Sequence, residues 1–242
     1  MALINLRNAL MTGKRLPPGV PYVECLNNTT CLCHTDSIAR QIQPYTISMW
    51  VNISSSQPSL GEGRIVCLTG TSGTFTVGID AGLSYESGTY KFIGAFIQNR
   101  SFGYTKFNYQ QYLDNWHNLI ITYNGSEVKT YIDGAQKNSV AGRQTGALTN
   151  AKLGFGCILW NGSMISGGPM GKYANLNYWD RILSAAEIAD VKSAMTYIPT
   201  DAAHRYDMNI QNERIADVGT AGGWDFTTIR DFENGVYVPE AQ

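Results

Sequence analysis

The chain has 242 residues, of which 43% are hydrophobic and only 15% are charged. Typical proteins carry about 25% charged residues, and this combination of low charge and ample apolar content excludes a disordered chain. The net charge of -1 lacks the basic excess that indicates nucleic-acid binding. The 25 glycines and 14 tyrosines are typical of an all-β protein with many turns, of the kind found outside cells or on particle surfaces.

The sequence predicts neither a membrane span nor a signal peptide. No apolar run approaches the ~18 residues needed to cross a bilayer. Near the N-terminus, Asn5, Arg7 and Asn8 interrupt the apolar stretch, and Lys14 and Arg15 follow it instead of preceding it. We therefore expect a protein that is made in a cytoplasm without an export signal and that does not enter a membrane.

Residues 1–16 are predicted to form a short amphipathic arm. Leu3, Leu6, Leu10 and Met11 recur at roughly helical spacing and give the arm one apolar face. Prolines at positions 17, 18 and 21 then end the helix and produce an extended hinge. The arm is either a docking element that attaches the protein to something else or a frayed lead-in.

Short strands separated by loops rich in Gly, Ser and Pro are predicted for the middle of the chain. Residues 45–53 alternate between inward and outward side chains, as in a half-buried antiparallel strand. Asn124-Gly125, between two β-rich runs, is a strong hairpin signal, because type I′ turns require positive φ at both central residues. The predicted strands are 22–24, 45–53, 64–68, 74–79, 91–97, 101–107, 116–123, 127–132, 152–158 and 173–179, with weak ones at 224–230 and 235–238.

One helix is predicted after the last strong strand. Ser184 and Glu187 form a capping box, in which each side chain bonds the backbone N–H of the other residue. The helix should run to about Met195, with Ile188 and Val191 on its buried side. The predicted organisation is therefore an arm and hinge (1–21), a β domain (22–198) and a polar tail (199–242) that packs on the domain or on a neighbour.

Three segments, in this order, carry a resemblance to a known family. Residues 45–51, 116–134 and 171–188 resemble the early aromatic strand, the central hairpin, and the last strand with its helical cap in the laminin-G-like members of the concanavalin A-type lectin/glucanase superfamily. The resemblance implies an all-β jelly-roll sandwich of two antiparallel sheets.

The opening of the chain carries a second resemblance. Residues 1–17, followed by 22–24, resemble the start of laminin-G-like proteins from gut bacteria and their tailed phages. That resemblance implies a virion surface protein, either a head fibre or a capsid decoration protein. It implies capsid or other virion proteins as partners and a homo-oligomer, for which we expect a trimer.

Neither a metal nor another cofactor is predicted. The family often binds calcium through an acidic residue on the final strand, and Ala174 and Asn175 stand at those positions here. Calcium prefers several oxygens that include carboxylates, so the departure argues against a calcium site of the family type. The five cysteines are an odd number and lack a second ligand pair for zinc, which favours thiols over a metal or a disulfide framework.

The sequence gives no catalytic constellation. A retaining glycosidase needs two carboxylates about 5 Å apart, and the nearest such pair, Asp231 and Glu233, lies in the tail outside the matched segments. His34, His117 and His204 are scattered, and His117 is expected to be structural. We therefore expect a protein that is not an enzyme.

Carbohydrate binding needs an aromatic plate beside amide, hydroxyl or carboxylate groups. Predicted loops or their edges place Tyr85, Tyr104, Trp160 and Asn161 as candidates, and Trp160 beside Asn161 is the first choice. The alternative is that Trp160 closes one end of the sandwich. The other matched tryptophans, Trp50, Trp116 and Trp179, are expected to pack in the core or on a sheet.

These observations leave three hypotheses for the function. The first is a non-enzymatic phage head fibre or capsid decoration protein on the virion surface, displaying a lectin-like jelly roll that contacts glycans or the host surface. The second is a bacterial glycan-binding module. The third is a glucanase-type glycosidase that uses Asp231 and Glu233.

Overall fold

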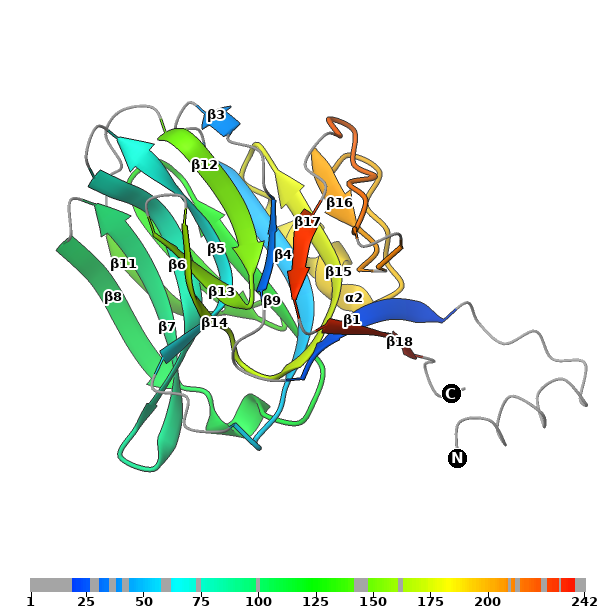
Figure 1. Cartoon of the computed structure of the whole chain (residues 1–242), viewed down its shortest axis with the longest axis horizontal. Helices are drawn as coiled ribbons and strands as arrows, with labels where there is room; N and C mark the ends of the chain where they lie inside the picture. The colour runs from blue at the N-terminus through cyan, green and yellow to red at the C-terminus, as the bar shows by residue number, and fades with distance from the viewer. Residues whose placement is uncertain are drawn as a thin grey trace, which may run out of the picture.

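The computed structural model describes residues 19–26, 31–34, 38–40, 44–57, 62–72, 75–98, 101–141, 148–160, 163–208, 210–211, 214–222, 226–230 and 232–237. Two eight-stranded sheets, both wholly antiparallel in their described pairs, form the body of the molecule (Figure 1). This architecture confirms the predicted all-β sandwich. Among the described helices, none combines the length and apolar character needed to cross a membrane.

The first sheet has the order β11-β10-β9-β4-β15-β1-β18, and β16 pairs with β15 beside this path. Its strands are β1 (Val20–Cys25), β4 (Tyr45–Ile53), β9 (His117–Tyr123), β10 (Glu127–Ile132), β11 (Ala135–Ala141), β15 (Gly171–Trp179), β16 (His204–Tyr206) and β18 (Phe232–Tyr237). β15 pairs with β4 on one side and with β1 on the other. Because β1 also pairs with β18, the first and last described strands lie side by side in this sheet.

The second sheet has the order β17-β2-β12-β5-β6-β7-β8, and β3 pairs with β12. Its strands are β2 (Cys31–His34), β3 (Ile38–Arg40), β5 (Glu62–Ser72), β6 (Phe75–Glu86), β7 (Thr89–Gln98), β8 (Ser101–Asn108), β12 (Leu148–Phe155) and β17 (Phe226–Arg230). A separate hairpin joins β13 (Cys157–Trp160) to β14 (Ser163–Gly167). Residues 199–242 therefore contribute β16 and β18 to the first sheet and β17 to the second.

The core lies between the two sheets and follows from the alternation along each strand. In β4 the side chains of Tyr45, Ile47, Met49, Val51 and Ile53 are at most 4% exposed, and they belong to one apolar cluster with residues of the second sheet. The intervening residues of β4 point to the outer face, away from the second sheet. This face of the first sheet carries the helix and both sites described below.

The tight turns of the first sheet differ in one respect from the prediction. The loop at Asn124-Gly125 is three residues long, and the Asn124 carboxamide oxygen closes it by accepting the backbone N–H groups of Ser126 and Glu127. The two-residue turn with positive φ at both positions is instead Asp133-Gly134, between β10 and β11. The Asn-Gly pair thus marks a hairpin, but the asparagine side chain replaces the expected turn geometry.

Helix α2 (Ala185–Ser193) packs on the outer face of the first sheet and ends two residues before the predicted Met195. Both bonds of the predicted capping box are present between Ser184 and Glu187. Ile188 and Val191 join a buried cluster with Ile120, Trp179, Leu183 and Ala202. The predicted role of Trp179 in sheet packing agrees with its exposure of 2%.

An ion-pair network ties the start of α2 to the segments around it. The Arg181 guanidinium lies 2.6 Å from the Glu187 carboxylate and also contacts Asp201, which accepts the indole N–H of Trp179. Hydrogen bonding from Arg181, followed by the Ser184 backbone N–H, lowers the pKa of Glu187 from its ordinary 4.5 to about 2. A carboxyl group whose pKa is lower in the folded than in the unfolded protein stabilises the fold when the pH lies above the pKa of that group in the unfolded state.

This network predicts a specific acid sensitivity. The stabilisation from Glu187 should be fully present above about pH 4.5 and should be lost as the pH falls towards 2. Glu187→Gln removes the charge and should therefore lose less stability than the parent protein across this window. Urea unfolding at pH 6, 4, 3 and 2.5 measures the difference, and parallel pH profiles for the two proteins would contradict the assignment.

Candidate functional site

The register of three strands sets two rows of side chains side by side on the outer face of the first sheet. In the first row Glu24 of β1 pairs with Lys172 of β15, which pairs with Asn52 of β4. In the second row Tyr22 pairs with Ala174, which pairs with Trp50. A row of charged and amide groups therefore lies next to a row that carries aromatic rings.

Three half-buried aromatic residues, Tyr22, Trp50 and Trp116, form what we call the aromatic cluster. They pack on a small buried group made of Val20, Ala174 and Met195. The rings of Tyr22 and Trp116 meet edge to face, with centroids 5.8 Å apart and an interplanar angle of 62°. Ala174 has no side-chain atoms beyond Cβ, which leaves room for the rings of Tyr22 and Trp116 to meet over the sheet.

A polar hollow of about 320 Å³ adjoins the aromatic cluster. Its polar lining comes from Glu24, Asn52, Ser54, Asp114 and Lys172. Lys172 joins the two features, because its Nζ atom lies 4.0 Å from the Glu24 carboxylate and 5.4 Å from the centroid of the Tyr22 ring. The site thus offers a carboxylate, an amide, a hydroxyl and an ammonium group next to aromatic faces.

Asp114 closes the hollow and is held in its charged form. Its backbone N–H donates to the carbonyl of Ile53 at 2.8 Å, and its Oδ1 atom accepts the backbone N–H of Ser55 at 2.9 Å. Hydrogen bonds from Ser55 lower the pKa of the Asp114 carboxyl below its usual range. Asp114 is therefore an acceptor at neutral pH, and it also anchors the loop after β4.

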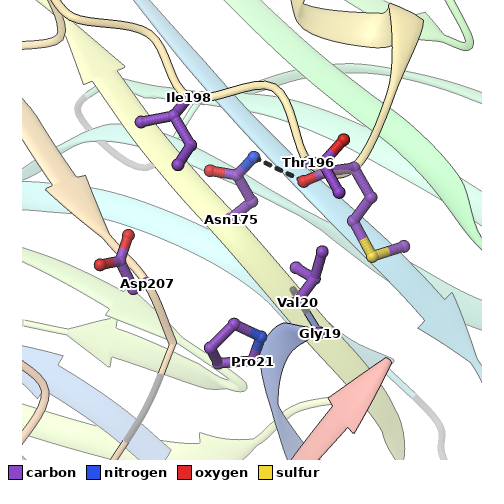
Figure 2. Close-up of a pocket in the computed structure, with 8 residues that line it drawn as sticks. Gly19, Val20, Pro21, Asn175, Thr196, Ile198 and Asp207 are labelled. Atoms are coloured by element: carbon purple, nitrogen blue, oxygen red, sulfur yellow. Dashed lines mark hydrogen bonds between the residues drawn. The ribbon is translucent and has the colours of Figure 1, made fainter. Parts of the chain in front are cut away.

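A second cavity, the apolar pocket, lies at the start of β1 and measures about 180 Å³. Figure 2 shows Val20 and Pro21 of β1 facing Ile198 across Asn175, with Asp207 at the side. Met195 and Thr196, from the segment after α2, complete the wall. The lining is largely apolar, and Asp207 supplies its carboxylate.

Asn175 builds this pocket from a bulge in β15. The register of β15 against β4 shifts between Ala174 and Asn177, and Asn175 adopts a left-handed φ of 47°. The bulge aims the Asn175 carboxamide at the segment after α2, where its Nδ2 atom donates to the carbonyls of Met195 at 3.0 Å and Tyr197 at 2.7 Å. Asn175 thus fixes residues 195–198 above the sheet at the position where the family places a calcium ligand.

No group of three His, Cys, Asp or Glu side chains gathers as a set of metal ligands within the part of the chain that the structure describes. Two histidines serve as partners of carboxylates. His117 Nδ1 lies 2.7 Å from Asp133, and the buried His204 Nδ1 lies 2.6 Å from Asp217. Glu233 stands on β18 opposite Glu24, and Asp231 lies outside the described residues.

Of the four candidate residues predicted from loops, the structure describes Tyr85 in full and only the backbone of Tyr104 and Trp160. Tyr85 of β6 is 50% exposed, and its ring is tilted by 48° against that of Tyr90, with 4.8 Å between the ring centroids. Tyr104 of β8 pairs with Ala95, five residues along β7 from Tyr90, which at ~3.3 Å per residue is roughly 16 Å away. Trp160 is the last residue of β13. The described part of the structure does not include the side chains of Tyr104 and Trp160 or any atom of Asn161. The arm residues Leu3, Leu6, Leu10 and Met11 also lie outside it.

The comparisons with known proteins agree with this architecture. The profile of the concanavalin A-like lectin/glucanases superfamily matches residues 27–189, which is more than half of the chain. The protein belongs to this superfamily. The laminin-G-like jelly roll predicted from the three segments is therefore confirmed.

Solved structures with the same fold include two proteins of distant sequence. The heptameric SAP-like pentraxin from Limulus polyphemus has a TM-score of 0.59 at 14% identity, with 91% of this chain and 95% of the pentraxin covered. The receptor binding domain of botulinum neurotoxin D has a TM-score of 0.51 at 15% identity, with 85% of this chain and 56% of that chain covered. At these identities the likeness is one of fold. No curated protein sequence matches the chain significantly.

Substituting Asn175 should loosen the wall of the apolar pocket. Asn175→Ala loses two hydrogen bonds to carbonyls, worth about 1 kcal/mol each, and strains a left-handed backbone by about another 1 kcal/mol. Asn175→Gly loses the same bonds without that strain, so it should cost about 2 kcal/mol against about 3 kcal/mol for alanine. Urea unfolding compares the two variants, and a loss below 0.5 kcal/mol for both would show that the amide does not hold the segment.

Proposed function

We propose that this protein is a non-enzymatic glycan-binding module whose ligand lies over the aromatic cluster and the polar hollow. The observation that carries the proposal is the position of Lys172, which lines the polar hollow and whose ammonium group lies 5.4 Å from the centroid of the Tyr22 ring. A sugar ring presents an apolar face that packs on aromatic rings and hydroxyls that need donors and acceptors. The two features together supply both requirements.

The size and composition of the hollow support a small polar ligand. Its volume of about 320 Å³ lies at the lower end of the ~300–1,000 Å³ typical of small-molecule sites. Glu24 and Asp114 accept hydrogen bonds, Lys172 donates them, and Asn52 and Ser54 can do either. Such mixed donors and acceptors suit the hydroxyls of a single glycan residue, with further sugar units reaching the aromatic cluster.

The same carboxylates support binding better than hydrolysis. A glycosidase needs one carboxyl that stays protonated near neutral pH as the general acid, with a raised pKa. Asp114 has a lowered pKa, and its Oδ1 atom already accepts the backbone N–H of Ser55. Glu24 lies beside the Lys172 ammonium on the edge of the hollow. Asp114 therefore lacks the environment of a general acid.

We further propose that the module is displayed on a virion surface, as a phage head fibre or capsid decoration protein. The support is the resemblance of residues 1–17, which lie outside the described residues, to the start of laminin-G-like proteins from gut bacteria and their tailed phages. The arm would attach the module to capsid proteins or to sister copies, and the jelly roll would contact host or mucosal glycans. A bacterial glycan-binding module is the alternative.

Binding should depend on the aromatic cluster. Trp116→Ala should weaken binding of any glycan hit from an array at least ~10-fold, or about 1.4 kcal/mol, because it removes the ring that closes over the sheet. Lys172→Met should also weaken binding while it keeps the length of the side chain. Isothermal titration calorimetry with the array hit measures both effects.

Tyr85→Ala is the matched control, since Tyr85 is an exposed ring on the other sheet. It should leave affinity unchanged, and circular dichroism should show all three variants folded. If Tyr85→Ala abolishes binding while Trp116→Ala does not, the ligand binds at the β6–β7 hairpin and the proposed site is wrong. An array without any hit would instead contradict the glycan-binding function itself.

The virion proposal has its own test. Purified particles of the source phage should contain this chain in stoichiometric amounts by mass spectrometry, and antibodies against the jelly roll should label intact particles. Detection of the chain in infected cells but not in particles would overturn the proposal. That outcome would favour the bacterial module if the gene lies outside a phage genome.

A further inference from the structure

We propose that the arm of one copy docks in the apolar pocket of a second copy, so that the protein assembles by arm exchange. The arm is residues 1–16, and the pocket is the cavity lined by Val20, Pro21, Met195, Ile198, Asn175 and Asp207. This inference goes beyond glycan binding and does not depend on it.

The pocket has the size and lining of a receptor for apolar side chains. Its volume of about 180 Å³ compares with a cavity of roughly 150 Å³ that holds a benzene-sized group. Ile198, on the rim, is 57% exposed, which leaves an isoleucine side chain largely in water. One or two leucine or methionine side chains would fill the space and cover Ile198. The arm offers these in Leu3, Leu6, Leu10 and Met11.

Charge favours the same occupant. Asp207 lines the pocket with its side chain 53% exposed, and the ion pair that it forms with Arg205 Nε is long at 3.7 Å. The arm carries Arg7, Lys14 and Arg15 and contains no acidic residue. An apolar segment with basic residues therefore complements an apolar pocket with a carboxylate, whereas an acidic or neutral peptide would leave Asp207 without a new partner.

The position of the pocket explains why the occupant is a second copy. Gly19, Val20 and Pro21 line the pocket themselves, so the arm leaves the domain at the pocket's edge (Figure 2). Pro17 and Pro18 favour an extended chain of ~3.1 Å per residue and disfavour helical conformation at Leu16 and Pro17. A stiff exit hinders the arm from turning back into its own pocket, which favours the pocket of a neighbour.

Full-length variants test the exchange by light scattering. The parent protein should form an oligomer, and either Leu6→Asp with Leu10→Asp in the arm or Ile198→Asp in the pocket should raise the dissociation constant at least ~10-fold. Both sites are suited to substitution, because Ile198 is mostly exposed and the arm precedes β1. Val218→Asp is the matched control, since Val218 is an apolar residue 45% exposed and is not among the described pocket residues.

Mixing the two defective proteins gives the sharpest result. The arm variant keeps an intact pocket, and the pocket variant keeps an intact arm. An equimolar mixture should therefore form a heterodimer, although neither variant associates with itself. Asp207→Lys should also weaken assembly, and Lys14→Glu with Arg15→Glu in the same chain should restore it. Glycan affinity at the aromatic cluster, measured on the arm variant, reports separately on the proposed function.

Three outcomes would overturn the exchange. The first is a parent protein that stays monomeric at every concentration. The second is an oligomer that survives Ile198→Asp unchanged. The third is a mixture that gives no heterodimer while protease digestion shows the arm protected within single copies, which would place each arm in its own pocket.

Discussion

The pairing of β15 with two neighbours at once is the constraint on which the rest of the structure depends. β15 lies between β4 and β1, and its buried side carries Tyr173, Leu176 and Tyr178 into the core. The approach of β4 is close at Gly171, where a Cβ atom would lie 2.4 Å from the carbonyl oxygen of Asn52. A glycine there permits the register that sets Lys172 between Glu24 and Asn52. That register determines which side chains are neighbours on the outer face.

The bulge in the same strand creates the second site. Without the shift between Ala174 and Asn177, Asn175 would take its place in the ordinary alternation of the sheet. With the shift, its carboxamide reaches the backbone beyond α2, and the strand resumes its pairing at Leu176 with Tyr206 of β16. Asp207 follows directly after β16, so the bulge and the added strand together bring a carboxylate to the edge of the apolar pocket. The bulge thus helps to position the Asn175 carboxamide, residues 195–198 and Asp207 around the apolar pocket.

Sequence patterns predicted the parts of the fold that local physics decides. Alternation identified β4, and the spacing of Ser184 and Glu187 identified the start of α2, because both signals depend on neighbours in sequence. β11 was missed, since Ala135, Gln136 and Lys137 are exposed on an edge strand and leave no apolar alternation to read. Trp50 and Trp116 were expected to pack in the core or on a sheet. They do pack on the sheet, but only the long-range register shows that they meet Tyr22 beside Lys172. Periodicity along one strand carries no information about which strand lies next to it.

The two proposed sites share their foundation, and this has a thermodynamic consequence. Val20 and Met195 belong to the buried group beneath the aromatic cluster, and they also line the apolar pocket. A side chain that enters the pocket contacts these residues from one side, while a ligand on the aromatic cluster presses on the rings that pack against them from the other. If filling the pocket changes the packing of Met195, it changes the surface that Trp50 and Trp116 offer to a ligand. Any such coupling is reciprocal, because the change in the free energy of ligand binding caused by assembly equals the change in the free energy of assembly caused by the ligand. Val20 and Met195, which both sites share, would carry that coupling within one packed cluster.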